Sequence, residues 1–139
     1  NKFGVDEKKF FELVKYIKKS KYLNIKCLSV HIGSQILEVK PYENMLKALD
    51  KIIKKTNHSF EYIDLGGGMG IDYQNNQKVL NLKKYSLKIE KFLKDNSSKI
   101  IFEPGRSIVG NAGTLISLRK SAAFLEKGVE IYIKPRDSA

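Results

Sequence analysis

Apolar residues recur every three to four positions in three stretches of the chain, which is the period of one face of an α-helix. Asp6 can cap the first of these helices, and Pro41 suits the first turn of the second. The sequence therefore predicts three amphipathic helices. Their apolar positions are Phe10, Phe11, Val14 and Ile17; then Met45, Leu46, Leu49, Ile52 and Ile53; and finally Leu82, Tyr85, Ile89, Phe92 and Leu93.

Short apolar runs between these helices predict strands. Residues 23–30 form a mostly apolar run that is rich enough for a strand buried on both faces. Shorter runs at residues 60–65 and 100–102 end at three glycines and at Pro104. Residues 114–118 predict one more strand.

The alternation of strands and helices, repeated about every 35 to 40 residues, indicates an α/β fold built from βα units on a parallel sheet. A (β/α)8 barrel and a doubly wound sheet both fit this pattern. A complete barrel needs about 250 residues, whereas this chain has 139. The chain is therefore expected to cover roughly half a barrel, and its start without Met suggests that it was cut from a longer protein.

The charge of the chain is strongly basic, with 26 Lys and Arg against 15 Asp and Glu and a net charge of +11. Most of the bases are lysines on the polar faces of the predicted helices, interleaved with acids, and no cluster of Arg or aromatic residues accompanies them. Solvated helix faces explain this better than nucleic-acid binding does. The chain contains no run of about 18 apolar residues, which a membrane-spanning helix would need. A single cysteine, Cys27, fits a reducing cytoplasm.

Three unusual segments directly follow three of the predicted strands: residues 31–35 (HIGSQ), 66–70 (GGGMG) and 103–107 (EPGRS). The carboxyl ends of parallel strands share one edge of a sheet, and functional residues collect there. We therefore expect the three segments to converge on one site.

An anion is the first ligand that these segments suggest. Gly66, Gly67 and Gly68 let backbone N–H groups approach a phosphate closely, and Ser34 adds a hydroxyl donor. A bare tight turn is the alternative for the glycines. His31 could be a base, a metal ligand, a flat stacking surface or a structural residue. We expect no metal site, because no second His or Cys has ligand spacing.

Glu103 and Arg106 flank the rigid turn at Pro104 and Gly105. A carboxylate at a buried strand end is costly unless it meets a positive partner. Arg106 could be that partner in a simple ion pair. Alternatively, Glu103 meets a cationic group of a ligand and Arg106 holds a carboxylate or phosphate.

Three motifs, in this order, resemble the diaminopimelate decarboxylase family: residues 30–35 (VHIGSQ), 64–71 (DLGGGMGI) and 103–113 (EPGRSIVGNAG). Residues 2–5 (KFGV) resemble the strand end that precedes these motifs in the family. The resemblance covers residues 1–118. Ornithine and arginine decarboxylases are related and share the Gly-Gly-Gly and Glu-Pro-Gly-Arg elements, but they usually differ after Gly33 and after Arg106.

This resemblance implies a pyridoxal 5'-phosphate-binding (β/α)8 barrel of the alanine racemase type, of which the chain covers the central to late part. It implies that His31 stacks on the cofactor ring and that Glu103 pairs with the ring nitrogen, the two catalytic assignments. Arg106 would lie at the cofactor and the substrate, where it can hold an anionic group. Ser34, Gly66, Gly67, Gly68 and Gly105 would help to hold the cofactor phosphate, and Pro104 would be a further cofactor-binding residue.

The implied reaction is the conversion of meso-2,6-diaminopimelate to L-lysine and CO2 in lysine biosynthesis. The cofactor is an electron sink for the carbanion left by CO2, and a carboxylate at the ring nitrogen deepens that sink. Related racemases are expected to place an Arg there, so Glu103 favours decarboxylation. The expected protein is a cytoplasmic homodimer that acts on a small amino acid and binds neither nucleic acid nor membrane.

Two departures from the family limit what this chain can do alone. The family's cofactor-binding lysine belongs to an earlier strand, and the motifs of its C-terminal β domain are absent here. Residues 119–139 read as a divergent or truncated tail. We therefore expect the isolated chain to be inactive. The alternatives are an ornithine- or arginine-type decarboxylase, or a non-catalytic remnant that binds pyridoxal phosphate or another phosphate.

Overall fold

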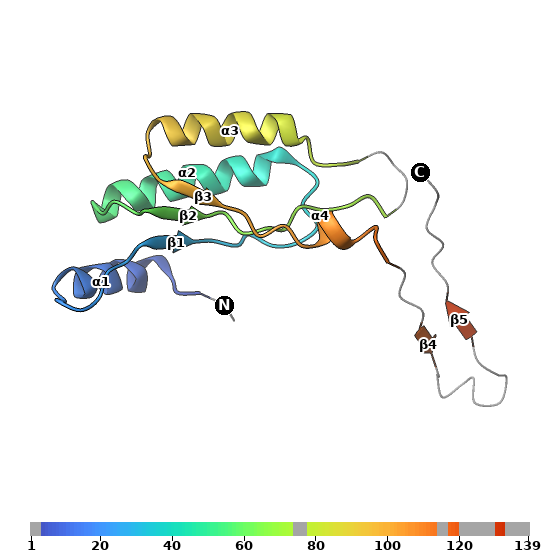
Figure 1. Cartoon of the computed structure of the whole chain (residues 1–139), viewed down its shortest axis with the longest axis horizontal. Helices are drawn as coiled ribbons and strands as arrows, with labels where there is room; N and C mark the ends of the chain where they lie inside the picture. Colours follow the sequence, from blue (N-terminus) through green and yellow to red (C-terminus); the bar gives the residue numbers. More distant parts are fainter. Residues whose placement is uncertain (1–3, 74–77, 114–116, 120–129, 133–139) are drawn as a thin grey trace.

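The computed structural model of the chain describes residues 4–73, 78–113, 117–119 and 130–132 (Figure 1). The first helix, α1, spans Glu7–Lys18 and buries Val14. Asp6 caps it as predicted, since its side chain accepts a hydrogen bond of 2.9 Å from the backbone N–H of Lys9.

Three parallel strands form the sheet: β1 (Cys27–Ser29), β2 (Tyr62–Asp64) and β3 (Lys99–Ile101), in the order β1-β2-β3. In the register of the sheet, Leu28 of β1 pairs with Ile63 of β2, and Ile63 pairs with Ile100 of β3. Strands β1 and β2 are shorter than the apolar runs that predicted them, whereas β3 has three residues, as many as the run at residues 100–102. The parallel βα order that the sequence predicted is confirmed.

The other two predicted helices are α2 (Val39–Thr56) and α3 (Leu82–Lys94). Pro41 lies in the first turn of α2, and the side chain of Asn81 caps α3 by accepting from the backbone N–H of Lys84. Both helices pack their apolar faces on the sheet, and the core between them contains the fully buried Ile63 and Leu65. The rings of Tyr42 and Tyr85 join the two helices, with centroids 4.4 Å apart.

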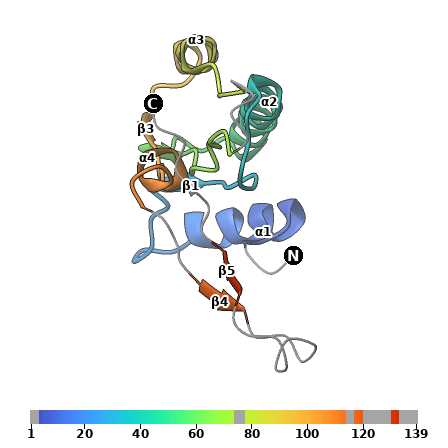
Figure 2. The same ribbon diagram turned by 90° about the vertical axis from the view of Figure 1, so that its right-hand side faces the viewer.

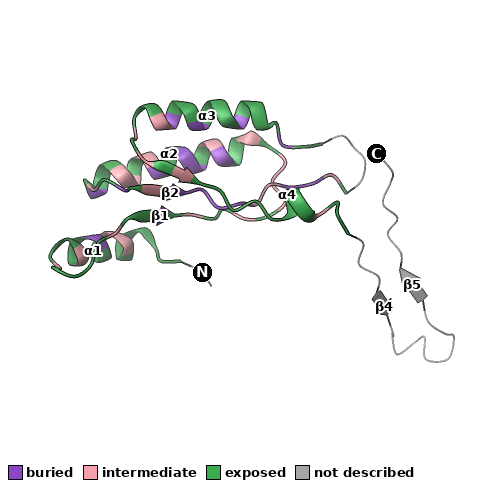
Figure 3. Ribbon diagram, viewed as in Figure 1, coloured by how far each residue is buried: buried purple, intermediate pink, exposed green. Residues whose placement is uncertain are grey.

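The helices α1, α2 and α3 lie in an arc around the sheet, as the wall of a barrel would (Figure 2). The opposite face of the sheet is open, because Cys27 and Ser29 of β1 are exposed and only Leu28 is buried (Figure 3). The prediction of a first strand buried on both faces is therefore wrong for this structure. The apolar run suits a strand whose second face is covered, and in the described part of the chain nothing covers it.

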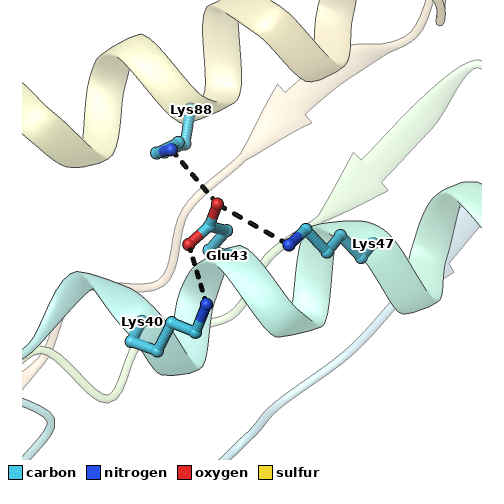
Figure 4. Close-up of polar contacts among 4 residues, drawn as sticks. All are labelled: Lys40, Glu43, Lys47 and Lys88. Carbon is cyan, nitrogen blue, oxygen red and sulfur yellow. Dashed lines mark hydrogen bonds and ion pairs between the residues drawn. The ribbon is translucent and has the colours of Figure 1, made fainter.

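Polar contacts tie neighbouring helices together. Lys18 of α1 donates hydrogen bonds of 2.9 and 2.7 Å to the carbonyls of Thr56 and Asn57 at the end of α2. Glu43 of α2 lies between three lysines (Figure 4). Its carboxylate is 3.1 Å from Nζ of Lys88 on α3. These lysines therefore act within the helical layer, as solvated charges of the polar helix faces.

Beyond the sheet, a short helix, α4, spans Arg106–Val109 and was not predicted. Strand β4 (Ser117–Arg119) pairs antiparallel with β5 (Glu130–Tyr132). The strand predicted at residues 114–118 is thus present at its last two residues, while residues 114–116 lie outside the described part. No helix among the described residues is long and apolar enough to cross a membrane.

Candidate functional site

The three segments singled out in the sequence meet at the carboxyl edge of the sheet. The hydrogen-bond ladder continues past the strands and holds them together. The N–H of Val30 donates to Asp64 O, that of Leu65 to Ile101 O and that of Glu103 to Gly66 O, at 2.9 to 3.0 Å. The predicted convergence of the segments is therefore present in the structure.

Close packing explains why glycines occupy the middle segment. A Cβ on Gly67 would lie 2.2 Å from the carbonyl oxygen of Glu103, and one on Gly68 would lie 2.2 Å from that of Gly33. Gly66 has a φ of +64°, and a Cβ there would lie 2.6 Å from the carbonyl oxygen of Val30. Only glycine allows the three strand ends to approach this closely. The bare-turn interpretation is thus incomplete, and the phosphate role of these glycines stays a prediction.

Asp64, which the sequence analysis did not single out among the site residues, fixes the start of the glycine segment. Its carboxylate is buried and accepts hydrogen bonds from Ser29 Oγ at 2.9 Å and from the Gly66 N–H at 2.8 Å. Both partners are neutral donors, and together they compensate for burying the charge. The register of the sheet places Ser29 beside Asp64, which the sequence alone does not reveal.

Tyr42 supports the same segment from the helical side. The hydroxyl of Tyr42 donates a buried hydrogen bond of 3.2 Å to the carbonyl of Gly67. Burial raises the pKa of this hydroxyl, so it remains a protonated donor at neutral pH. The glycine segment is therefore held on one side by Asp64 and on the other by Tyr42.

The predicted polar site residues are exposed at this edge. His31, Ser34, Glu103 and Arg106 are all solvent-accessible, as are Pro104 and Gly105 beside them. The ring of His31 lies against the glycine segment, since its Nδ1 would be 2.9 Å from a Cβ on Gly66. An imidazole, a carboxylate and a guanidinium group are thus available to a ligand at one edge.

Arg106 does not pair with Glu103. Among the ion pairs of the described residues none joins the two side chains. Instead, Nη1 of Arg106 donates a hydrogen bond of 3.1 Å to Oε1 of Gln35, and the guanidinium lies 5.8 Å from the ring centroid of Tyr73. The simple ion-pair alternative is therefore not what the structure shows.

An open groove of about 670 Å³ runs along β1 and contains His31. Its walls come from β1, α1 and α2, and from Gly4 and Val5 before α1. It lies at the edge where β1 has no strand partner among the described residues. The other predicted site residues do not line this groove.

A parallel sheet with helices along its outer side and polar residues at its carboxyl edge is the arrangement of an enzymatic α/β barrel. The chain belongs to the pyridoxal-dependent decarboxylases, since the family model described as "Pyridoxal-dependent decarboxylase, pyridoxal binding domain" matches residues 1–110.

Relatives within this family carry the name that the motifs suggested. Diaminopimelate decarboxylase of Aquifex aeolicus is 37% identical over 137 residues, which cover 96% of this chain and 32% of the relative. The crystal structure of diaminopimelate decarboxylase from Helicobacter pylori, complexed with L-lysine, has a TM-score of 0.74. It is 35% identical, over 86% of this chain and 32% of that one.

A third relative agrees with these two. The diaminopimelate decarboxylase of M. jannaschii, also in complex with L-lysine, has a TM-score of 0.72 and 27% identity, over 96% of this chain and 33% of that one. The present chain therefore spans about a third of the length of its relatives. The resemblance to this family and the prediction of an incomplete (β/α)8 barrel are confirmed.

Proposed function

We propose that this chain is the site-bearing part of a decarboxylase that converts meso-2,6-diaminopimelate to L-lysine and CO2. The observation that carries the proposal is the meeting of His31, the glycine segment and Glu103 at one edge of a parallel sheet. The names of the relatives, and the L-lysine in two of their structures, support this substrate.

The residues at this edge fit pyridoxal phosphate. The three glycines leave no side chain between the strand ends, while polar side chains surround them. In our proposal, Ser34, the glycine segment (Gly66, Gly67, Gly68) and Gly105 would hold the phosphate, and His31 would stack on the pyridine ring. When bound, the cofactor supplies the electron sink that decarboxylation requires.

Glu103 and Arg106 have separate roles in this proposal, one toward the cofactor and one toward the substrate. The Glu103 carboxylate holds a proton on the ring nitrogen, since a negative charge nearby favours the protonated form of that nitrogen. Arg106 orients the substrate through one of its anionic groups, by charge-assisted hydrogen bonds. The absence of an ion pair between these two described residues supports the proposal, because it leaves each charge available to a ligand.

We further propose that residues 1–118 belong to the barrel and that the active protein is a cytoplasmic homodimer. The match of residues 1–110 to the pyridoxal-binding domain supports this division. In our proposal the lysine that binds the cofactor covalently is supplied by another part of the native polypeptide. The 139 residues alone should then release no CO2 from diaminopimelate beyond what free cofactor releases.

The decisive experiment compares wild-type and Glu103→Gln forms of the native polypeptide that contains this chain. The amide has nearly the same size, so folding and cofactor binding should persist. The single-turnover rate of CO2 release should fall about 10- to 100-fold, as expected for losing one charge-assisted interaction of about 1.5–3 kcal/mol. An unchanged chemical step in cofactor-saturated Glu103→Gln would refute the role of this carboxylate.

The substrate is tested by supplying meso-diaminopimelate, ornithine and arginine side by side. Preference for diaminopimelate supports the proposal, whereas preference for ornithine or arginine would replace it with a related decarboxylase. Cofactor binding without turnover of any of the three would point to the non-catalytic alternative. Ser34→Ala serves as a companion variant, because it should weaken cofactor affinity more than it slows the chemical step.

A further inference from the structure

Gln35 adopts a backbone conformation that few residues other than glycine adopt. Its φ is +60°, in the left-handed region, where most side chains are strained. The side chain is half-buried beside the glycine segment. Strained residues of this kind persist where their surroundings hold them and often lie at functional sites.

The amide of Gln35 is fixed at two points. Its Nε2 donates to the carbonyl of Ile71, and its Oε1 accepts the N–H of Ile71 at 3.3 Å. The backbone beside it is also paired, since the N–H of Ile36 donates to Gly68 O at 2.9 Å and that of Gly70 donates to Ile36 O at 3.0 Å. Because the N–H of Ile71 needs an acceptor and its carbonyl needs a donor, the amide has only one satisfactory orientation.

That orientation turns the amide oxygen toward Arg106. Nη1 of Arg106 donates to Oε1 of Gln35 at 3.1 Å, and the guanidinium also lies over the ring of Tyr73. Both partners are uncharged. The guanidinium is thus oriented while its positive charge stays uncompensated by either of them, whereas a carboxylate in place of the amide would neutralise it.

We propose that Gln35 is a positioning residue that holds the guanidinium of Arg106 in place for a carboxylate of the substrate. This inference rests on the proposed function, in which Arg106 binds the substrate. Gln35 itself touches neither substrate nor cofactor in this proposal. Its effect should therefore appear in substrate affinity more than in the chemical step.

The test uses Gln35→Gly in the native polypeptide. Glycine suits the positive φ, so the backbone conformation at residue 35 should persist even though the two hydrogen bonds of the amide with Ile71 are lost. KM for diaminopimelate should rise about tenfold, as for the loss of one hydrogen bond to a charged group, while kcat changes less than about threefold. Asn57→Gly is the matched control, because Asn57 also has a positive φ, of 46°, at the end of α2. It should leave KM unchanged.

Two further variants separate positioning from a general structural role. Gln35→Glu keeps the shape but places a negative charge on Arg106, and should raise KM at least as much as Gln35→Gly. In an Arg106→Lys background, Gln35→Gly should have little additional effect, since the two residues act as one unit. An unchanged KM in Gln35→Gly, or full additivity with Arg106→Lys, would overturn the inference while leaving the proposed function intact.

An NMR measurement that does not depend on turnover distinguishes failure of the positioning inference from failure of the proposed function. In the wild type, the Arg106 guanidinium should give slowly exchanging N–H signals in nitrogen-15 NMR, and Gln35→Gly should abolish them. If no diaminopimelate is decarboxylated and these signals are still lost, the proposed function fails and the positioning contact stands. Signals that survive in Gln35→Gly would overturn the contact itself.

Discussion

Replacing Gly67 with alanine tests the close approach of the strand ends. The new Cβ would lie 2.2 Å from the carbonyl oxygen of Glu103 and 3.1 Å from its carbonyl carbon. An ordinary contact requires the two segments to separate by about 1 Å, and buried segments resist such a shift because interiors are closely packed. A backbone carbonyl cannot rotate away as a flexible side chain can.

The expected change in the free energy of unfolding is the sum of three contributions. Overpacking costs about 1–3 kcal/mol, and stretching the hydrogen bond from the Glu103 N–H to Gly66 O costs up to about 1 kcal/mol more. The reduced freedom of the unfolded chain returns about 0.4–1 kcal/mol. We therefore expect Gly67→Ala to lower the free energy of unfolding by about 2 kcal/mol, and by no more than about 3.6 kcal/mol.

Urea denaturation of the native polypeptide, with the cofactor absent from both samples, measures this difference. Gly113→Ala is the control, because no atom of the described residues lies within 4 Å of a Cβ at Gly113. The control should be neutral or stabilising by less than about 1 kcal/mol. If Gly67→Ala unfolds at the same urea concentration as the wild type, the segments of Gly67 and Glu103 do not pack this closely in solution.

Three more substitutions probe the helical layer. Tyr85→Phe should raise the free energy of unfolding by about 1 kcal/mol, because the buried hydroxyl has no hydrogen-bond partner among the described residues; a loss of stability would reveal one. Lys18→Met should lower the free energy of unfolding by about 0.5–1 kcal/mol, because it removes an exposed cation from the last carbonyls of α2. Lys19→Met is the exposed control, and an equal loss of stability in it would contradict this explanation. A hydrogen bond from Lys88, followed by the charges of the nearby lysines, lowers the pKa of Glu43 in the folded protein. The ionised carboxylate therefore stabilises the fold at pH values above the ordinary glutamate pKa of about 4.3. This contribution is lost as the pH falls from that value through the lower pKa of the folded state. Acid titrations of stability for the wild type and Glu43→Gln should therefore converge in that window, and a constant difference across it would argue against the interaction.

The helices could be predicted from the sequence because their signals are local. Periodic apolar positions and the cap Asp6 depend on neighbours within one turn. The burial of the first strand could not be predicted in the same way, since it depends on what covers the far face of the sheet.

For the site, the motifs predicted which segments meet, because parallel strands place their carboxyl ends together. They did not predict how the segments are held. The contacts of Asp64 with Ser29 and of Gln35 with Arg106 join residues 35 and 71 positions apart in the chain. Sequence spacing carries no signal for such contacts, although Asp64 and Gln35 both lie inside the motifs themselves.

The ladder that continues past the strands also has a thermodynamic consequence for ligand binding. Val30, Leu65 and Glu103 are each tied to a neighbouring segment by a backbone hydrogen bond, so these segments lose conformational entropy when the sheet forms. A ligand that arrives later meets a preorganised edge and orders little additional backbone. The site thus takes its stiffness from the sheet, and a substitution that loosens a strand should weaken ligand binding without touching the ligand.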